Sequence, residues 1–465
     1  MLPDDVLLAI FDLYMVPYRS GYVIESSDSL QVTTIKTWQS LVHVCRRWRG
    51  IVFESPRRLN LQLRCTPQTS ARKTLDAWPV LPLHIKGDVT ETSVDNVIAQ
   101  LELSDRIRQI ELNCFTTSQI ENFCTAMQMP FPELIGLYLS FRGLSYGPVL
   151  LDSFLGGSAP RLRFLSLVAI PLLGLPKLFL SSTNLVSLYL RRIPHSGYIS
   201  PEAMATCLSV LTNLGSLELK FESPQSSPDQ ENRRSPPPTR SVLPALTQFE
   251  FKGVDEYLEV LVARIDTPRL LQLNATFFND IEFHTPELIR FVSRSSKFKA
   301  LNEALVFFDT QTTSVTLLPQ APNVGHFTVE ISCRGLDWQL SSLAQICTTS
   351  LPLLTTTENL FIYEQGDSLF DWKDGIENIE WLELLLLFTA VKNLYLSKQF
   401  APSIARALQE MTGGGTTGVL SALQNLYLEG FKPSESVEEG IERFISARQL
   451  ANHPVVILVW DRDLE

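Results

Sequence analysis

The sequence predicts an α/β (α+β) solenoid, in which short parallel strands stack on one another and helices or loops return the chain between them. Two observations predict it. The pattern L-x-x-L-x-L, in which Ile, Val or Phe can replace Leu, recurs along most of the 465 residues, and segments with helical periodicity separate many of the copies. A chain of this length also exceeds the size at which one hydrophobic core usually stops growing, so several domains or an elongated repeat array are expected.

The repeated pattern has strong and weak copies, at intervals of mostly about 22 to 34 residues, which is the range of solenoid repeats. The strong copies lie at 106–114, 132–140, 160–168, 183–191, 212–220, 244–252, 268–276, 322–330, 391–398 and 422–430. Weaker copies lie at 57–63, 80–87, 303–309 and 358–364. Each strand would turn its leucines inward, and neighbouring units would bury what one unit cannot bury alone.

The repeats resemble irregular leucine-rich repeats, although the consensus asparagine after the strand is missing. This resemblance implies a horseshoe with a parallel sheet on its concave side. A β-helix or a mixed α/β domain remains the structural alternative. Return helices are expected within 200–214, 255–265 and 402–411, and the segment Val455–Trp460 is expected to be a last strand that helps to cap the stack.

Composition divides the chain into a helical N-terminal segment, 1–54, and a solenoid, 55–465. The solenoid is interrupted by a Pro- and Ser-rich stretch at 222–241, expected to be disordered, and by a Gly-rich stretch at 412–418, expected to be a flexible loop.

Charge and cysteine usage exclude several classes of function. The net charge of −11 argues against nucleic acid as the main ligand. Seven scattered cysteines without a CxxC pair, and six single histidines, argue against a disulfide framework and against a zinc site, so no metal and no cofactor are expected. No apolar stretch is long enough to span a membrane. The expectation is a cytoplasmic and/or nuclear protein.

No catalytic motif is present. There is no Gly-rich phosphate loop, no G-x-S-x-G and no H-E-x-x-H, so the chain is not expected to be an enzyme. Cys45 lies on an apolar stripe between two tryptophans, where a packed, inert thiol is expected.

The N-terminal segment carries two apolar stripes. The first follows Pro3, which suits the first turn of a helix, and includes Leu13. The second places Trp38, Leu41, Cys45, Trp48 and Val52 along one face of a single expected helix. Two such helices cannot bury all of this surface between themselves, so they are expected to pack on the solenoid or on a partner.

These two stretches resemble a known family. LPDDVLLAIF followed by LVHVCRRWRGIV is similar to the F-box, which opens with Leu-Pro and carries a Val-Cys-Arg-x-Trp core. The following SPRRLNLQLRCTP and LDAWPVLPLHIKG resemble F-box proteins of mushroom-forming fungi. The resemblance implies the substrate-recognition subunit of an SCF-type ubiquitin ligase, with a Skp-type adaptor and a cullin as partners and a protein as substrate.

By matching position, the resemblance assigns one set of residues to the adaptor interface or to the core of the F-box, without separating the two roles. The set is Leu2, Pro3, Val6, Leu7, Ile10, Phe11, Leu41, Val44, Cys45 and Trp48. The link 16–37 between the two stretches is longer than in the family, which leaves adaptor binding open. Two helices that only cap the solenoid remain the alternative.

In an L-x-x-L-x-L strand, the residue between the last two apolar positions points to the concave side. Tyrosine offers a large contact area with a polar tip, which suits a binding surface. The residues expected to bind a protein substrate there are Tyr138, Tyr189, Arg191, Glu218, Glu250, Phe361, Tyr363, Tyr395 and Tyr427. The pairs of Glu218 with Lys220 and of Glu250 with Lys252 are expected to be solvated charge ladders. The alternatives are a stand-alone repeat scaffold without a ubiquitin role and a small-molecule receptor.

Overall fold

The computed structural model describes most of the chain in two compact units, Met1–Ser182 and Thr183–Glu465, which are treated separately below. The described residues are 2–15, 37–56, 58–59, 61–68, 70, 80–143, 147–171, 175–224, 239–278, 285–298, 301–319, 325–332, 336–350, 352–364, 378–412, 419–430 and 439–462. Almost all of the link 16–37, most of the stretch 222–241 and most of the stretch 412–418 lie outside the described residues, so the expectations for them stay predictions.

The first unit begins with three helices, where the sequence predicts two. These are α1 (Asp4–Met15), α2 (Thr37–Val44) and α3 (Arg46–Glu54). The single helix expected across Trp38 and Val52 is wrong, because Cys45 takes an extended conformation (φ −159°, ψ 168°) and ends one helix before the next begins. Hydrophobic periodicity continues through this break, which is why the pattern alone does not reveal it.

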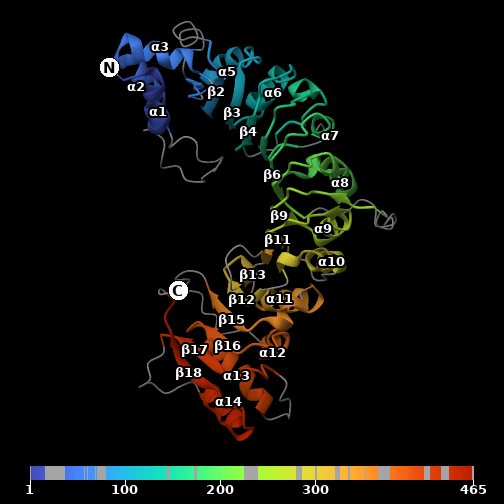
Figure 1. The fold of residues 1–465 in the computed structure, drawn as a ribbon. Helices are drawn as coiled ribbons and strands as arrows, with labels where there is room; N and C mark the ends of the chain where they lie inside the picture. The colour runs from blue at the N-terminus through green and yellow to red at the C-terminus, as the bar shows by residue number, and fades with distance from the viewer. Residues whose placement is uncertain are drawn as a thin grey trace. The chain divides into compact units, whose positions relative to one another are not determined.

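A parallel sheet follows the helices within the same unit, with its strands in chain order (Figure 1). The strands are β1 (Leu63–Cys65), β2 (Leu83–Asp88), β3 (Ile107–Cys114), β4 (Gly136–Phe141) and β5 (Phe164–Val168). The return segments include η2 (Glu91–Ser93), α5 (Val94–Leu101), α6 (Thr117–Ala126), η3 (Phe154–Gly157) and α7 (Leu175–Phe179). The register places Leu112 beside Leu139 and Leu139 beside Leu167, and all three are at most 1% exposed.

The second unit continues the same construction. In the spatial order of the sheet, its strands are β6 (Ser187–Ile193), β7 (Ser216–Phe221), β9 (Gln248–Gly253), β11 (Gln272–Phe278), β14 (His326–Ser332), β13 (Thr312–Pro319), β12 (Leu301–Phe308), β15 (Asn359–Glu364), β16 (Asn393–Leu396), β17 (Asn425–Glu429) and β18 (Val456–Trp460). Its helices are α8 (Pro201–Ser209), α9 (Asp255–Val262), α10 (Pro286–Arg294), α11 (Leu336–Ser350), α12 (Asn378–Leu385), α13 (Ala401–Thr412) and α14 (Glu439–Leu450). The short strands β8 (Ser241–Val242) and β10 (Ile265–Asp266) pair separately.

The expectation of an entirely parallel sheet is wrong at one place. Strand β13 runs antiparallel to both β12 and β14, and these three strands appear in reverse chain order between β11 and β15. The sequence TTSVTLLP of β13 lacks the repeated leucine pattern, so this strand is not predicted. The short turn 309–311 joins β12 and β13 as a hairpin, which is the connection that antiparallel strands allow.

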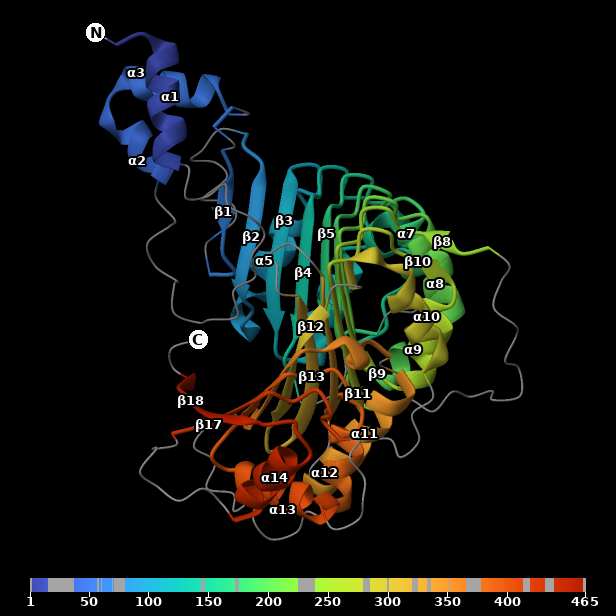
Figure 2. The same cartoon turned by 60° about the horizontal axis from the view of Figure 1, so that its bottom comes forward.

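Each strong copy of the pattern coincides with a strand, and the helices expected within 200–214, 255–265 and 402–411 are α8, α9 and α13. The expected last strand is β18. In the second unit, helices α8–α14 lie on one side of the strands (Figure 2). In each unit, we call the side of the sheet away from the return helices the open face. The α/β solenoid is therefore confirmed, with a hairpin inserted in its sheet. Among the described residues, no helix is long and apolar enough to cross a membrane.

Candidate interaction surfaces

The start of α1 is held by Arg47 from α3. Its Nε donates to Asp4 Oδ1 at 3.1 Å, and its Nη2 donates to the Leu2 carbonyl oxygen at 2.5 Å. Asp4 and Asp5 fill the first helical turn, where carboxylates complement the positive end of the helix dipole. Arg47 therefore fixes the position of Leu2 and Pro3, which are both exposed.

Burial divides the predicted N-terminal residues into two groups. Leu7, Phe11 and Leu41 are at most 6% exposed and form the core between the helices. The Trp48 ring packs edge-on against Phe11 at 4.8 Å. Trp38, on α2, donates its indole N–H to the Gln62 carbonyl oxygen at 3.1 Å and so attaches the helices to the segment that enters β1.

The remaining predicted residues are exposed, and so are Leu13 and Tyr14 on α1. Leu2, Val6, Ile10 and Leu13 follow one another at helical spacing, and Ile10 is 42% and Leu13 74% exposed. We call the N-terminal apolar surface the set of exposed residues Leu2, Pro3, Val6, Ile10, Leu13, Tyr14, Val44 and Cys45. Neighbouring exposed apolar side chains of this kind mark interaction sites in soluble proteins.

The expectation that Cys45 is a packed thiol is wrong. The cysteine is exposed, and its Sγ accepts a hydrogen bond from the Trp48 N–H at 3.5 Å as the N-cap of α3. A residue that caps a helix must lie at the break between two helices, which explains its exposure.

The open face of the first unit carries Tyr138 in the middle of β4, where the register aligns it with Glu111 on β3. Glu111 contacts His84 at 3.1 Å and Lys86 at 2.6 Å. Burial raises the pKa of Glu111, but the hydrogen bonds and charges of His84 and Lys86 outweigh it and lower the pKa to about 2. The carboxylate is therefore ionised at neutral pH and orders this part of the open face.

In the second unit, Arg191, Glu218, Lys220 and Glu250 form a network that we call the charged cluster. Arg191 donates to both oxygens of Glu218, at 2.7 Å and 2.5 Å. Lys220 lies between Glu218 and Glu250, at 2.8 Å from each. The pairing of β6 with β7 shifts register between Leu190 and Ile193, and a bulge of this kind re-aims the neighbouring side chains.

The charged cluster corrects the expectation that Glu218 and Lys220 form a solvated ladder with an accessible Glu218. Glu218 is only 2% exposed, because the two cations cover it. Burial raises its pKa, but the hydrogen bonds from Arg191 and Lys220 and their charges leave the pKa below its ordinary value. Tyr189 belongs to the same region, since its hydroxyl hydrogen-bonds Ser216 at 3.2 Å and its ring lies 5.2 Å from the Arg191 guanidinium.

Further along the same open face, Phe361, Tyr395 and Tyr427 stack in register on three adjacent strands, and we call them the aromatic ladder. Their centroids are 4.1 Å and 4.2 Å apart, with interplanar angles of 12° and 10°. Trp460 on β18 meets Phe361 and Tyr395 edge-on, at 6.0 Å and 5.7 Å. Strands β18 and β15 are three strand spacings apart, about 14 Å along the sheet. Because Trp460 nevertheless contacts Phe361, its side chain extends across the open face toward β15.

An asparagine ladder, which the leucine pattern does not predict, runs beside the aromatic ladder. Asn393 Nδ2 donates to Asn359 Oδ1 at 2.7 Å, and Asn425 Nδ2 donates to Asn393 Oδ1 at 2.8 Å. Asn359 in turn donates to Glu303 on β12 at 3.3 Å. The signal was an asparagine two residues before the outward aromatic residue in three successive repeats.

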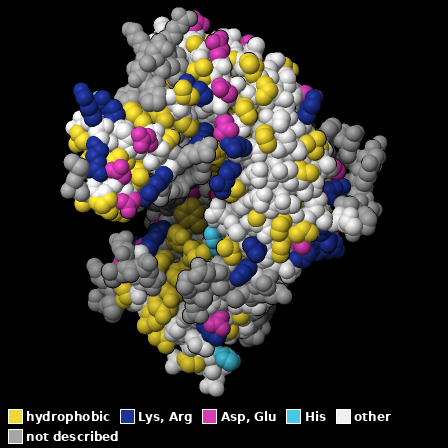
Figure 3. All heavy atoms as spheres, turned by 45° about the horizontal axis from the view of Figure 1, so that its top comes forward, with side chains coloured by type: hydrophobic (Ala, Val, Ile, Leu, Met, Phe, Trp, Pro, Cys, Tyr) yellow, Lys and Arg dark blue, Asp and Glu magenta, His cyan; other side chains and the backbone are white. Residues whose placement is uncertain are grey.

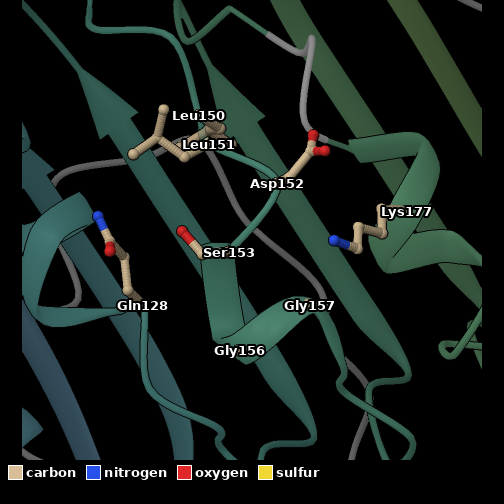
Figure 4. A pocket seen from close by; sticks show the side chains of 8 residues that line it. All are labelled: Gln128, Leu150, Leu151, Asp152, Ser153, Gly156, Gly157 and Lys177. Atoms are coloured by element: carbon tan, nitrogen blue, oxygen red, sulfur yellow. The ribbon is translucent and has the colours of Figure 1, made fainter.

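One hollow lies elsewhere, in the first unit, with a volume of about 660 Å³. Figure 4 shows Leu150, Asp152, Ser153 and Lys177 around it, contributed by the loops near η3 and by α7. Asp152 and Lys177 are the charged side chains of this lining, which offers no pair of carboxylates and no His or Cys. Among the described residues, no group of three His, Cys, Asp or Glu side chains is placed to hold a metal ion.

Basic and acidic side chains are interspersed over the face of the molecule in Figure 3, without an extended field of one sign. Nucleic-acid binding depends on clustered cations, so this face gives no support to such a ligand.

Comparison with known proteins adds little to the description from the strands themselves. No protein-family model matches the chain, and no curated protein matches it. Among solved structures, a leucine-rich repeat-containing protein of Legionella pneumophila, LegL7, is similar over 85% of this chain and 98% of its own, with 12% identity and a TM-score of 0.28. A score this low leaves the fold to be judged from the strand register of the chain. That register, with leucines at the repeated positions of stacked strands, describes an α/β solenoid of the leucine-rich-repeat type.

Proposed function

We propose that the chain is the substrate-recognition subunit of an SCF-type ubiquitin ligase. The helices α1–α3 would dock on a Skp-type adaptor, and through it on a cullin, while the open face of the solenoid would hold a protein substrate. The observation that supports this most strongly is the N-terminal apolar surface, whose stripe Leu2, Val6, Ile10 and Leu13 is exposed among the described residues.

The proposal is supported by how the stripe is organised. The residues that resemble the F-box divide into a buried set, which holds the helices together, and an exposed set, which Arg47 orders at its Leu-Pro start. Solvent-exposed apolar side chains cost free energy unless a partner covers them. In such a ligase the transfer chemistry belongs to other subunits, so this chain is proposed to be no enzyme, to need no cofactor and to supply proximity and orientation. It would work in the cytoplasm or the nucleus.

The experiment is co-purification of the full chain with a purified Skp-type adaptor. We expect capture by the unchanged chain and at least ten-fold weaker capture by Val6→Asp/Ile10→Asp, since a buried charge in an apolar interface costs several kcal/mol (~3). The matched control is Val80→Asp, which places the same charge on an aliphatic side chain that is 81% exposed outside the helices. Capture by Val80→Asp should equal that of the unchanged chain.

The second candidate is a stand-alone interaction scaffold with no ubiquitin role. The solenoid and its ordered open face favour it, and it requires no binding by α1–α3. The two candidates differ in one result. If the unchanged chain does not capture the adaptor at micromolar concentration, the ligase role is wrong and the scaffold remains.

A further inference from the structure

We call the part of the open face formed by β12 and β15–β17 the aromatic half. The Arg462 side chain lies against it in a geometry typical of a bound guanidinium. Arg462, which follows β18, lies with its guanidinium carbon 4.5 Å from the centre of the Tyr363 ring on β15. Its Nη2 donates to the Glu364 carbonyl oxygen at 2.5 Å. A ring face and a carbonyl acceptor together can hold a guanidinium, because the ring attracts the cation and the carbonyl orients one of its N–H groups.

Tyr363 differs from the rings of the aromatic ladder because one of its ring faces contacts a cation. Phe361, Tyr395 and Tyr427 lie face to face, so their inner ring faces are occupied by one another. Tyr363 instead packs edge-on against Phe307 at 5.5 Å and 65°, which leaves a ring face available to Arg462. Cations bind ring faces, not ring edges, because the negative part of the quadrupole lies over the face.

A second anchor lies two residues before the arginine. Trp460 is 5% exposed and packs against Phe361 and Tyr395. Its indole N–H is buried and has no hydrogen-bond partner among the described residues. A buried donor without a partner costs about 1–3 kcal/mol, so this position is not a fully satisfied part of the core. The contacts of Trp460 with Phe361 and of Arg462 with Tyr363 place both side chains beside β15.

Charge on this half of the open face also favours a cation. Glu303 accepts a hydrogen bond from Asn359, and Glu429 accepts one from the Lys398 backbone N–H at 3.2 Å. Neither carboxylate has an ion pair with a cation among the described residues, whereas Glu218 and Glu250 in the charged cluster both do. The aromatic half is therefore complementary to a basic ligand, and the charged cluster is not.

We propose that the open face of β12 and β15–β17, together with Trp460, recognises an extended segment of a partner protein that carries an arginine, and that Arg462 occupies this site within the chain. As a statement about substrates the inference rests on the proposed function, and it names their class. A tethered occupant competes at an effective concentration in the millimolar range, so a partner must displace it. The apparent affinity for a partner then depends on the fraction of molecules in which Arg462 has left the site.

The test uses the full chain and a labelled probe peptide, fluorescein-Gly-Leu-Ala-Arg-Gly-Ala-Gly-amide, titrated by fluorescence anisotropy. We expect Arg462→Ala to bind the probe at least ten-fold more tightly than the unchanged chain, because the competing guanidinium is gone. Adding Tyr363→Leu to that variant should remove the gain. A matched probe with Gln in place of Arg should show no gain. The control variant Arg406→Ala removes an arginine of α13, away from the open face, and should bind like the unchanged chain.

Equal affinity for the Arg and Gln probes, or no gain with Arg462→Ala, overturns the inference. Arg462 lies beyond the last strand, so the variant is expected to fold, which its thermal unfolding midpoint verifies; Trp460→Phe, which keeps an aromatic ring in place, supplies a second folded background. Adaptor capture is measured on the same preparations. Normal capture with failed probe binding counts against this inference alone, and failed capture with normal probe binding counts against the proposed function alone.

Discussion

The charged cluster and the aromatic ladder lie on the same open face and are built in opposite ways. In the charged cluster, Arg191 and Lys220 bury Glu218 until 2% of it is exposed. In the aromatic ladder, three rings stack at 4.1–4.2 Å without any charge of their own. The ions of the charged cluster pair with one another. Beside the aromatic ladder, by contrast, Tyr363 contacts the guanidinium of Arg462, which follows β18.

This difference shows that equivalent outward positions of the repeat can differ in burial and in the contacts they make. The outward residue of β7 is a buried glutamate, and the outward residue of β16 is a half-buried tyrosine, although both follow the same strand pattern. A buried ion is costly when it loses a partner, so the charged cluster should be sensitive to single substitutions. A row of stacked rings loses only contact area and should respond in smaller steps.

The largest effect is expected from Arg191→Ala. Glu218 would keep only Lys220, and an undercompensated buried charge should lower the free energy of unfolding by about 3 kcal/mol. Urea unfolding followed by circular dichroism measures the change. The matched control is the adjacent Arg192→Ala, whose partner Glu222 lies at 3.2 Å in an exposed pair, and which should cost less than about 1 kcal/mol. Similar losses for both variants would show that the cluster is not special.

A smaller loss is expected from Tyr395→Ala. This substitution removes the middle ring and both stacking contacts of the ladder, at about 2 kcal/mol of the free energy of unfolding. Tyr395→Phe keeps the ring and should change the free energy by less than about 0.5 kcal/mol. The same urea experiment measures both, and a Phe variant as damaged as the Ala variant would assign the effect to the hydroxyl instead of the stack.

Asn393→Ala should cost less again. Asn393 donates to Asn359 and accepts from Asn425, so two hydrogen bonds of the asparagine ladder are lost, at about 1 kcal/mol in total because water replaces part of them. Asn213→Ala, which loses one exposed hydrogen bond to the Thr183 carbonyl oxygen, is the control and should have a smaller effect. If the two variants are equal, the ladder adds nothing beyond its individual bonds.

The smallest effect is expected on the pH dependence. The pKa of Glu218 is lower in the folded chain than its ordinary value of 4.5. The ionised carboxylate therefore stabilises the fold above pH 4.5, and this contribution is lost as the pH falls from 4.5 through the folded-state pKa. Thermal midpoints between pH 7 and pH 3 should fall less steeply for Glu218→Gln than for the unchanged chain, whereas Tyr395→Phe should leave the slope unchanged. A steeper fall for Glu218→Gln would reverse the sign and contradict the account.

Much of the fold follows from the leucine pattern, because a strand that must bury three apolar side chains in register leaves a fixed spacing in the sequence. The pattern cannot reveal β13, since a Thr- and Ser-rich antiparallel strand buries its residues through a hairpin instead. It also cannot reveal the break at Cys45, because one extended residue does not disturb the apolar periodicity on either side.

The candidate surfaces are predictable in part. Outward positions such as Tyr395 and Tyr427 follow from strand alternation, and the structure places them together. Glu218 is buried beside Arg191 on a neighbouring strand and Lys220 on its own strand, a three-dimensional contact that a list of residue types does not contain. Trp460 and Arg462 escape prediction for a similar reason, since their contacts with β15 join residues almost a hundred positions apart.

The central claim is that the chain has two separate binding surfaces, one on the helices α1–α3 and one on the open face. Hydrogen–deuterium exchange of the full chain, with and without a purified Skp-type adaptor, tests it most directly. The account predicts slower exchange within Leu2–Tyr14 and around Val44–Trp48, with exchange in β15, β16 and β17 unchanged. Protection of those strands in place of the helices, or no protection anywhere, would contradict it.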